Sequence, residues 1–442
     1  MRTKCIVFLL AIFSLSQAQA QEGKIDFVSY DLSNGMHVIL HKDNTTPIVA
    51  VTITYHVGSK NEKADRTGFA HFFEHLMFEG SDNIARGEYD KLTQNAGGQL
   101  NANTSFDRTF YYELLPSNQL DLGLWMESER LFHLKLDSTG VETQRGVVKE
   151  ERKQSMDNQP YGSIMEQVFS HSYKVHPYRW TPIGSAQYID QASIAEFIDF
   201  HNTYYVPDNA TLSIAGDLDI ESTKKIIDKY FIGIPHGTKP IIRPTIVEPP
   251  QTAEVRDTVY DNIQLPAVIQ AYHMPAQGTD DFYALSMLTT LLSDGESSRM
   301  TKAIVDKQQK AVYLGAFPYP LEDPGLFFVF GVVNMGVDPK DLEEAINTEI
   351  AKAQNEDMSD SEFQKLRNKM ENKFVTRNST MAGIAESLAN YYVYFGDANL
   401  INTEIDRYMK VTKADIRRVA NQYLTKQNRV VLYYLPKASA QK

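Results

Sequence analysis

The 442-residue sequence predicts an α+β protein made of two similar domains, each a sheet covered by helices. Three observations favour this fold class. The length exceeds one ordinary core and suits two or three domains. A helix–strand unit that runs from Ser193 to Ile214 recurs 219 residues later, from Thr412 to Tyr433. A proline-rich segment separates the two copies. Duplication explains all three, and a chance likeness between two common units is the alternative.

Both copies of the unit open with a Ser/Thr-x-x-acid capping signature, Ser193 with Glu196 and Thr412 with Asp415. Apolar residues at helical spacing follow, and each copy ends in a run of β-forming residues. Each copy therefore predicts a helix that leads into a strand.

The prolines between residues 235 and 250 mark a boundary, because proline cannot continue a helix or a central strand. We expect residues 21–235 and 256–442 to form the two domains, joined by an extended linker over residues 236–255.

Helical and strand patterns alternate in both domains. The strongest strand patterns cover Ile48–His56, Arg108–Leu115, Ala210–Ala215, Ala267–His273 and Leu326–Val333. The longest helical patterns cover Gly68–Phe78, Gln119–Lys135, Thr143–Asp157 and Phe282–Leu292.

The composition is that of a globular protein, with 42% hydrophobic and 23% charged residues, which excludes a disordered or collagen-like chain. Lys and Arg number 44 against 56 Asp and Glu, a formal net charge of −12. Because an acidic surface repels phosphate backbones, we expect no nucleic-acid partner.

Residues 1–20 have the pattern of a cleaved signal peptide. Basic residues precede an apolar stretch from Cys5 to Leu15, and Ala18 and Ala20 are the small residues of a cleavage site. The stretch is shorter than the ~20 residues that cross a membrane, although an uncleaved anchor is the alternative. Cys5 is the only cysteine, so cleavage leaves a chain without disulfides. We therefore expect a periplasmic, or else secreted, protein with no stable membrane span.

The sharpest chemical signal is the motif His71-Phe-Phe-Glu74-His75. On a helix, His71 and His75 lie one turn apart on one face, so that two neutral imidazoles can reach one Zn²⁺. Glu74 then lies close enough to reach a water molecule on the metal without binding the metal. Taken alone, the motif also fits two half-exposed histidines on an amphipathic helix.

Catalytic zinc takes a third protein ligand and leaves a position for water. The segment Val147-Val148-Lys149-Glu150-Glu151 offers two carboxylates within a predicted helix. We expect both valines to lie on its buried face, which favours Glu151 over Glu150 without excluding the latter. The other glutamate then orients a histidine or is solvated.

In this context the motif resembles the metal helix of the pitrilysin/insulysin family of zinc peptidases, the inverzincins. The resemblance is to the short bacterial and mitochondrial-processing-peptidase-like branch. Gly68–Gly80 matches the metal-helix motif, and Val147–Glu151 matches the segment that aligns Glu151 with the distal ligand. The likeness continues through Gly97–Thr104, Pro160–Gly162, His176–Gly184 and Ser297–Arg299. It thus covers essentially the whole mature chain.

The resemblance implies two homologous α/β sandwich domains, each with a mainly antiparallel sheet, with the zinc in the N-terminal one. It also implies a zinc metalloendopeptidase that hydrolyses peptides or small unfolded proteins. His71, His75 and Glu151 then hold one Zn²⁺ per chain, and Glu74 is the general base for a water molecule that the metal activates.

The resemblance further implies a substrate-binding edge strand, to which a peptide is added as another strand. Its residues here are Asn101, Ala102, Asn103 and Thr104. An ordinary glycine turn into a strand is the alternative.

Two positions depart from the family pattern. Gln144 stands where many relatives have a second acidic residue, seven positions before the ligand. Relatives also complete the site with an Arg and a Tyr from the other half, seven residues apart. Here Tyr313 is present as the catalytic Tyr, but Asp306 stands at the Arg position and cannot donate to a substrate carbonyl.

The absence of an Arg at position 306 affects which partner we expect for this chain. We expect a homologous metal-free subunit that supplies the Arg/Tyr pair, and a homodimer or a self-sufficient monomer are the alternatives. For the function, the alternative is a non-catalytic peptide-binding or scaffold homologue.

Overall fold

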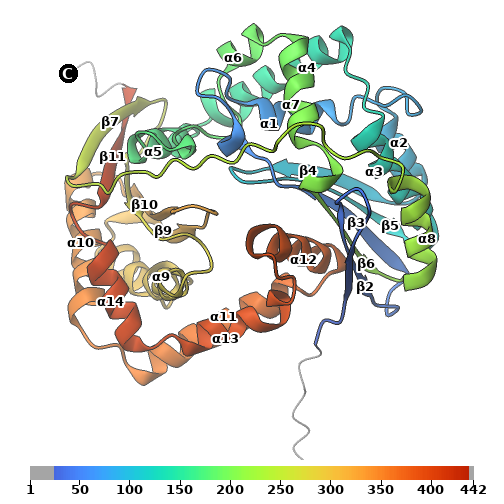
Figure 1. Ribbon diagram of the computed structural model, residues 1–442. Coiled ribbons are helices and arrows are strands. Elements are labelled where there is room, and N and C mark those ends of the chain that lie inside the picture. The colour runs from blue at the N-terminus through green and yellow to red at the C-terminus, as the bar shows by residue number, and fades with distance from the viewer. Residues whose placement is uncertain (1–23, 438–442) are drawn as a thin grey trace, which may run out of the picture.

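The computed structural model describes residues 24–437, which form two sheets covered by helices (Figure 1). The first sheet contains β1 (Val28–Asp31), β2 (His37–Lys42), β3 (Ile48–Tyr55), β4 (Gln99–Thr104), β5 (Thr109–Pro116) and β6 (Ala210–Gly216). The second contains β7 (Val255–Asp261), β8 (Ala267–His273), β9 (Ala311–Tyr319), β10 (Leu326–Val333) and β11 (Arg429–Pro436).

Helices precede and follow these strands in both halves of the chain. The first half carries α1 (Phe69–Leu76), α2 (Glu88–Asn95), α3 (Leu120–Phe132), α4 (Ser138–Arg152), α5 (Ile164–Ser172), α6 (Ala186–Gln191), α7 (Ile194–Tyr204) and α8 (Ile220–Phe231). The second carries α9 (Asp280–Ser293), α10 (Pro339–Asn355), α11 (Asp360–Arg377), α12 (Met381–Phe395), α13 (Leu400–Lys410) and α14 (Lys413–Tyr423).

Five strands of the first sheet follow the same order as the five strands of the second, and β1 is an additional edge strand of the first sheet. The strand orders of the two sheets are β1-β2-β6-β3-β5-β4 and β7-β11-β8-β10-β9. Each sheet contains one parallel pair, β2 with β6 and β7 with β11, and its other neighbouring strands are antiparallel. The expected α+β class, with two mainly antiparallel sheets under helices, is confirmed.

The internal repeat extends to side-chain contacts. β8 begins 219 residues after β3, and the same offset relates α14 to α7 and β11 to β6. Asn209 and Asn428 precede the last strands of the two sheets. Each donates a hydrogen bond of 2.8 Å to the carbonyl oxygen of a tyrosine at the end of the preceding helix, Tyr204 or Tyr423. The predicted helix–strand unit therefore forms twice with the same internal contact.

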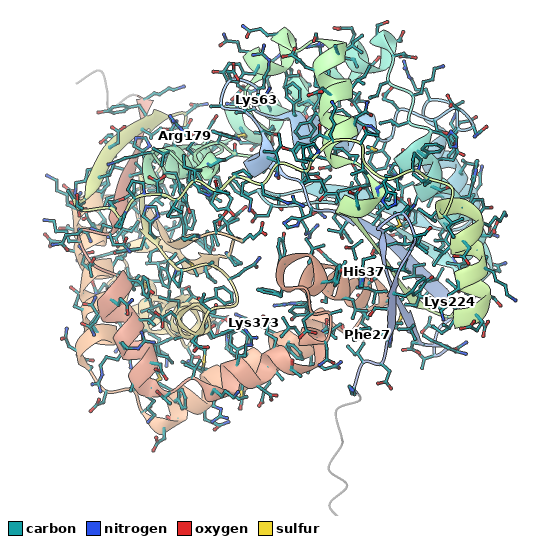
Figure 2. The ribbon with its side chains drawn as sticks, viewed as in Figure 1. Phe27, His37, Lys63, Arg179, Lys224 and Lys373 are labelled. Carbon is teal, nitrogen blue, oxygen red and sulfur yellow. The ribbon has the colours of Figure 1, made fainter. Side chains whose placement is uncertain are left out.

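Each half of the chain places one helix on the sheet of the other half (Figure 1). On the first sheet, α1, α3, α7 and α8 cover one face, and α12 of the second half covers the other. Ile384 and Leu388 of α12 join Ile39 of β2 in one buried cluster. At the same contact His37, labelled in Figure 2, stacks its ring on Tyr392 at 3.4 Å between centroids.

The reverse contact is made by α5. Val168 and Phe169 of α5 pack against Phe328 and Val430 of the second sheet, whose opposite face is covered by α9, α10 and α14. The two exchanged helices hold equivalent places in the repeat, because α5 lies between α4 and α6 and α12 between α11 and α13. The halves thus share their hydrophobic cores.

A cluster of ion pairs around the buried Lys60 also joins the halves. The Lys60 ammonium lies 3.0 Å from Asp107 of the first half and 3.2 Å from Asp323 of the second, and it also pairs with Glu322. Burial raises the pKa of Glu322, but the hydrogen bond from His56 and the charge of Lys60 outweigh it and bring that pKa to about 2.

The segment between Phe231 and Val255 contains no helix or strand and crosses the molecule from α8 to β7 (Figure 1). The predicted signal peptide, residues 1–20, lies outside the described residues. Among residues 24–437, no helix combines the length and the apolar character needed to cross a membrane.

Candidate metal centre

The candidate metal site is built on α1, a helix of eight residues. One face of α1 is buried against the first half's core, through Phe69, Phe72, Phe73 and Leu76. The spacing of these apolar residues leaves the histidines on the other face, where the side chains of His71 and His75 are 12% and 23% exposed. The helix is shorter than the predicted Gly68–Phe78, by one residue at its N-terminal end and by two at its C-terminal end.

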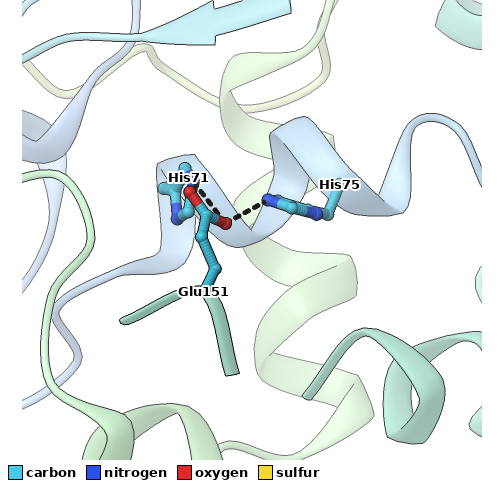
Figure 3. A group of neighbouring side chains, drawn as sticks. All are labelled: His71, His75 and Glu151. Atoms are coloured by element: carbon cyan, nitrogen blue, oxygen red, sulfur yellow. Dashed lines mark ion pairs between the residues drawn. The ribbon is translucent and has the colours of Figure 1, made fainter. Parts of the chain in front are cut away.

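Figure 3 shows Glu151 of α4 pointing at both histidines. Glu151 Oε2 lies 3.1 Å from His75 Nε2 and 3.6 Å from His71 Nε2. One candidate ligand atom from each residue lies within 4.8 Å of the other two. Among residues 24–437, this is the one group of His, Cys, Asp or Glu that could share an ion.

The position of α4 distinguishes the two neighbouring glutamates. Glu151 faces α1, whereas the exposed Glu150 contacts Lys153, the residue directly after α4, at 3.6 Å. The prediction that both valines lie on the buried face is wrong for Val147, which is 43% exposed, and right for Val148, which is 3% exposed. The buried face of α4 is therefore narrower than the valine pair indicated, and it passes through Val148.

The chemistry of this group fits Zn²⁺. Its atoms are two imidazole nitrogens and one carboxylate oxygen, a donor set typical of catalytic zinc. Glu151 Oε2 is buried and has hydrogen-bond geometry to no other group. The imidazoles of His71 and His75 hold the pKa of Glu151 well below its usual range, so the carboxyl is ionised, as a metal ligand must be.

Glu74 is held by the edge strand. Thr104 Oγ1, at the end of β4, donates a hydrogen bond of 2.6 Å to Glu74 Oε2. Sequence reasoning placed Thr104 in the substrate-binding strand and missed this contact, because no spacing rule links residues 30 positions apart.

Gln144 belongs to a separate contact beside the site. Gln144 Nε2 donates a hydrogen bond of 2.5 Å to Glu79, which also pairs with Arg86. Gln144 thus ties α4 to the segment after α1, and it is not part of the three-residue group.

The other expected substrate residues lie on β4, which ends the first sheet and pairs only with β5 among the described strands. Asn101 and Asn103 are exposed and Ala102 is half-buried. Asn103 accepts a hydrogen bond of 3.1 Å from Arg108. Since its outer edge has no partner strand, β4 offers main-chain groups beside α1.

Tyr313 lies on β9, which ends the second sheet as β4 ends the first. Its side chain is exposed, and Asp306 lies in the preceding π-helical turn, Thr301–Lys307. Neither residue is part of the group formed by the two histidines and Glu151.

Comparisons with known proteins agree with this geometry. Residues 37–182 match the family model of the insulinases (peptidase family M16), and residues 191–370 match that of the M16 inactive domain. The chain is also 30% identical over 433 residues to the zinc protease PqqE of Helicobacter pylori, which covers 97% of each protein. The chain belongs to the insulinase family of zinc proteases, peptidase family M16. The expected family is therefore confirmed.

Further proteins are similar over most of this chain. A crystal structure of a protease from Helicobacter pylori superposes with a TM-score of 0.89 at 29% identity, over 93% of this chain and 100% of that one. A probable mitochondrial-processing peptidase subunit beta from Arabidopsis thaliana is 23% identical, over 89% of this chain and 75% of that protein. The periplasmic protease PqqL of Escherichia coli shares the fold, with a TM-score of 0.76 at 18% identity, over 94% of this chain and 48% of that one.

Proposed function

We propose that this M16 protein is a zinc metalloendopeptidase that hydrolyses peptides or small unfolded proteins. The convergence of His71, His75 and Glu151, with Glu74 on the same helix, carries the proposal. These three residues would hold one Zn²⁺ per chain. Bound there, the metal would polarise a scissile carbonyl and lower the pKa of a water molecule.

The role proposed for Glu74 is to take a proton from the attacking water and to give it to the leaving amine. Thr104 donates to one carboxylate oxygen of Glu74 and so holds the carboxylate towards the histidine face.

We propose that the substrate binds along β4, through Asn101, Ala102, Asn103 and Thr104. The open edge of this strand supports the proposal, because its main-chain groups can pair with a peptide of almost any sequence. The contact between Thr104 and Glu74 places the end of this edge beside the proposed base.

We propose that a homologous partner subunit without metal supplies the Arg/Tyr pair, and a second copy of this chain is the alternative. The support is that Asp306 stands at the Arg position and that Tyr313 lies exposed on β9, outside the metal group. Activity that appears only on mixing with a copurifying subunit is the expected result. Full activity of the isolated monomer would overturn it.

We propose a periplasmic location, on the basis of the signal-peptide pattern of residues 1–20. Release by osmotic shock, with Gln21 as the first residue of the purified protein, is the expected result. A chain that stays with the membrane and keeps residues 1–20 would contradict it.

The test of the main proposal combines zinc content with cleavage of a quenched fluorescent peptide library. We expect stoichiometric zinc, and we expect Glu74→Gln to retain it while losing cleavage about 10³-fold or more. Glu151→Gln should lose both. The matched control is Glu150→Gln, which changes the exposed neighbouring carboxylate and should alter neither. A wild-type protein without zinc would refute the proposed function.

A further inference from the structure

Two buried ionisable side chains, an acid and a base, contact the two ends of α1. Glu62, 8% exposed, lies at the N-terminal end, and Arg130, which is not exposed at all, lies at the C-terminal end. Neither is in the group formed by His71, His75 and Glu151. Burying a polar or charged group away from water is costly, so each side chain needs partners to compensate for the lost water.

At the N-terminal end, Glu62 replaces a missing cap. The residue before α1 is Gly68, which has a φ of 95° and no side chain to accept hydrogen bonds from the first turn. Instead, Glu62 Oε2 accepts a hydrogen bond of 2.9 Å from the Gly68 amide, and Oε1 accepts one of 2.8 Å from the Ala70 amide. The Glu62 carboxyl thus satisfies two main-chain donors of the first turn. Burial raises the pKa of Glu62 to about 8, so these hydrogen bonds, rather than a charge at the helix dipole, are its contribution at neutral pH.

At the C-terminal end, Arg130 of α3 donates a hydrogen bond of 2.9 Å to the carbonyl oxygen of Met77, directly after α1. Its guanidinium pairs with Glu127 at 3.1 Å and Glu113 at 3.2 Å. It also lies 4.8 Å from the ring centre of Tyr111. A fixed cation therefore meets the negative end of the dipole.

The shortness of α1 gives these contacts their importance. Helices below ~12 residues are marginal on their own, so the surroundings determine where this one begins and how its axis lies. His71, Glu74 and His75 all project from the eight residues between the two buried side chains. A small shift or rotation of α1 would move all three relative to Glu151 on α4.

We propose that Glu62 and Arg130 are positioning residues, which hold α1 at both ends so that its histidines and Glu74 are set for metal binding and catalysis. This inference rests on the proposed function. Neither side chain touches metal or substrate, and both act through the main chain of α1.

The test compares Glu62→Gln and Arg130→Met with the wild-type protein. Zinc affinity is measured by chelator competition, and site geometry by the absorption spectrum of the Co²⁺-substituted full chain. We expect each variant to lose about tenfold or more in zinc affinity, with a changed Co²⁺ spectrum. In the presence of saturating zinc, kcat should fall while KM changes little.

Two buried residues of the second half serve as matched controls. Glu404 accepts a hydrogen bond of 2.5 Å from Tyr391, and Arg429 pairs with Glu254 and Glu343. Glu404→Gln and Arg429→Met should lower the thermal midpoint and leave zinc affinity and the Co²⁺ spectrum unchanged. If the α1 variants behave like these controls, the positioning role is refuted.

Two further results are decisive. If Arg130→Met does not fold, Arg130→Lys keeps the charge but not the forked donor geometry. It should then change the Co²⁺ spectrum relative to that of the wild-type protein, and an unchanged spectrum would refute the role. A wild-type chain that binds no zinc would instead refute the proposed function itself.

Discussion

Thr104 and Glu74 are joined by a hydrogen bond of 2.6 Å that connects the last residue of β4 to the metal-site helix. The strand that is free to take up a peptide and the side chain proposed as general base are therefore in direct contact. Because the hydroxyl donates to a carboxylate, the bond is of the charge-assisted, stronger kind.

Replacing Thr104 tests this link. We expect Thr104→Val to lower kcat about tenfold, because a general base that is not held in place transfers protons less efficiently. KM and zinc content should change little. Thr52→Val is the matched control, since Thr52 donates a hydrogen bond of 2.8 Å to Ser213 within the same sheet but away from α1. A loss in both variants alike would show a general effect on the sheet.

Removing the metal should destabilise the protein. The group joins α1 to α4, so an ion bound only by the folded chain stabilises it by about 4 kcal/mol at a free concentration of 1,000 times its Kd. We expect a chelator to lower the thermal midpoint and added Zn²⁺ to restore it. Glu74→Gln should keep this dependence and Glu151→Gln should lose it. If the thermal midpoint of the wild-type protein does not change when metal is removed or added, the proposed metal site is contradicted.

The start of α1 depends on a close approach of two main chains. A Cβ at Gly184 would collide with the backbone of Gly68. Gly87 has a similar φ, 72° against 62°, but its Cβ would meet open space. Gly87→Ala should therefore cost about 1 kcal/mol for the backbone conformation alone. Gly184→Ala should lower the free energy of unfolding, measured with urea, by clearly more than Gly87→Ala does. It should also weaken zinc binding. An equal loss of unfolding free energy in the two variants would contradict the importance of the close approach between Gly184 and Gly68.

The ion pairs between the halves predict a pH dependence. The pKa of Glu322 is about 2 in the folded protein against an ordinary 4.5, so its contribution is present above pH 4.5 and is lost as the pH falls towards 2. A shift of this size corresponds to about 3 kcal/mol.

Urea unfolding of metal-free wild type and Glu322→Gln should therefore differ most at neutral pH and converge near pH 2. A difference in unfolding free energy that does not vary with pH would show that the carboxylate contributes no charge interaction.

Much of the fold could be predicted from local sequence. The strands Ala267–His273 and Leu326–Val333 have their predicted bounds, because buried central strands are continuous apolar runs. The predicted helix Thr143–Asp157 begins earlier, at Ser138, where Asp137 accepts a hydrogen bond from the Gly140 amide as N-cap. A cap followed by weakly apolar residues gives little periodic signal.

The site was predictable only in part. The pair His71 and His75 could be recognised because helical spacing alone brings them together. Glu62 and Arg130 could not, because their contacts with α1 depend on how a separate turn and α3 pack against it. The exchange of helices between the halves was likewise invisible, since amphipathic patterns show that a face is buried but not which sheet covers it.

The exchange of α5 and α12 bears on how the duplicated chain arose. In a protein made of one half alone, the sheet face that now receives the exchanged helix would have been uncovered. Only a second copy of the same protein could have covered it with its own helix. The simplest ancestor is therefore a symmetric dimer of single halves, in which each protomer completed the core of its partner. Joining the two copies made that association independent of protein concentration. It also freed one copy of the histidine-bearing segment to diverge without loss of the shared core.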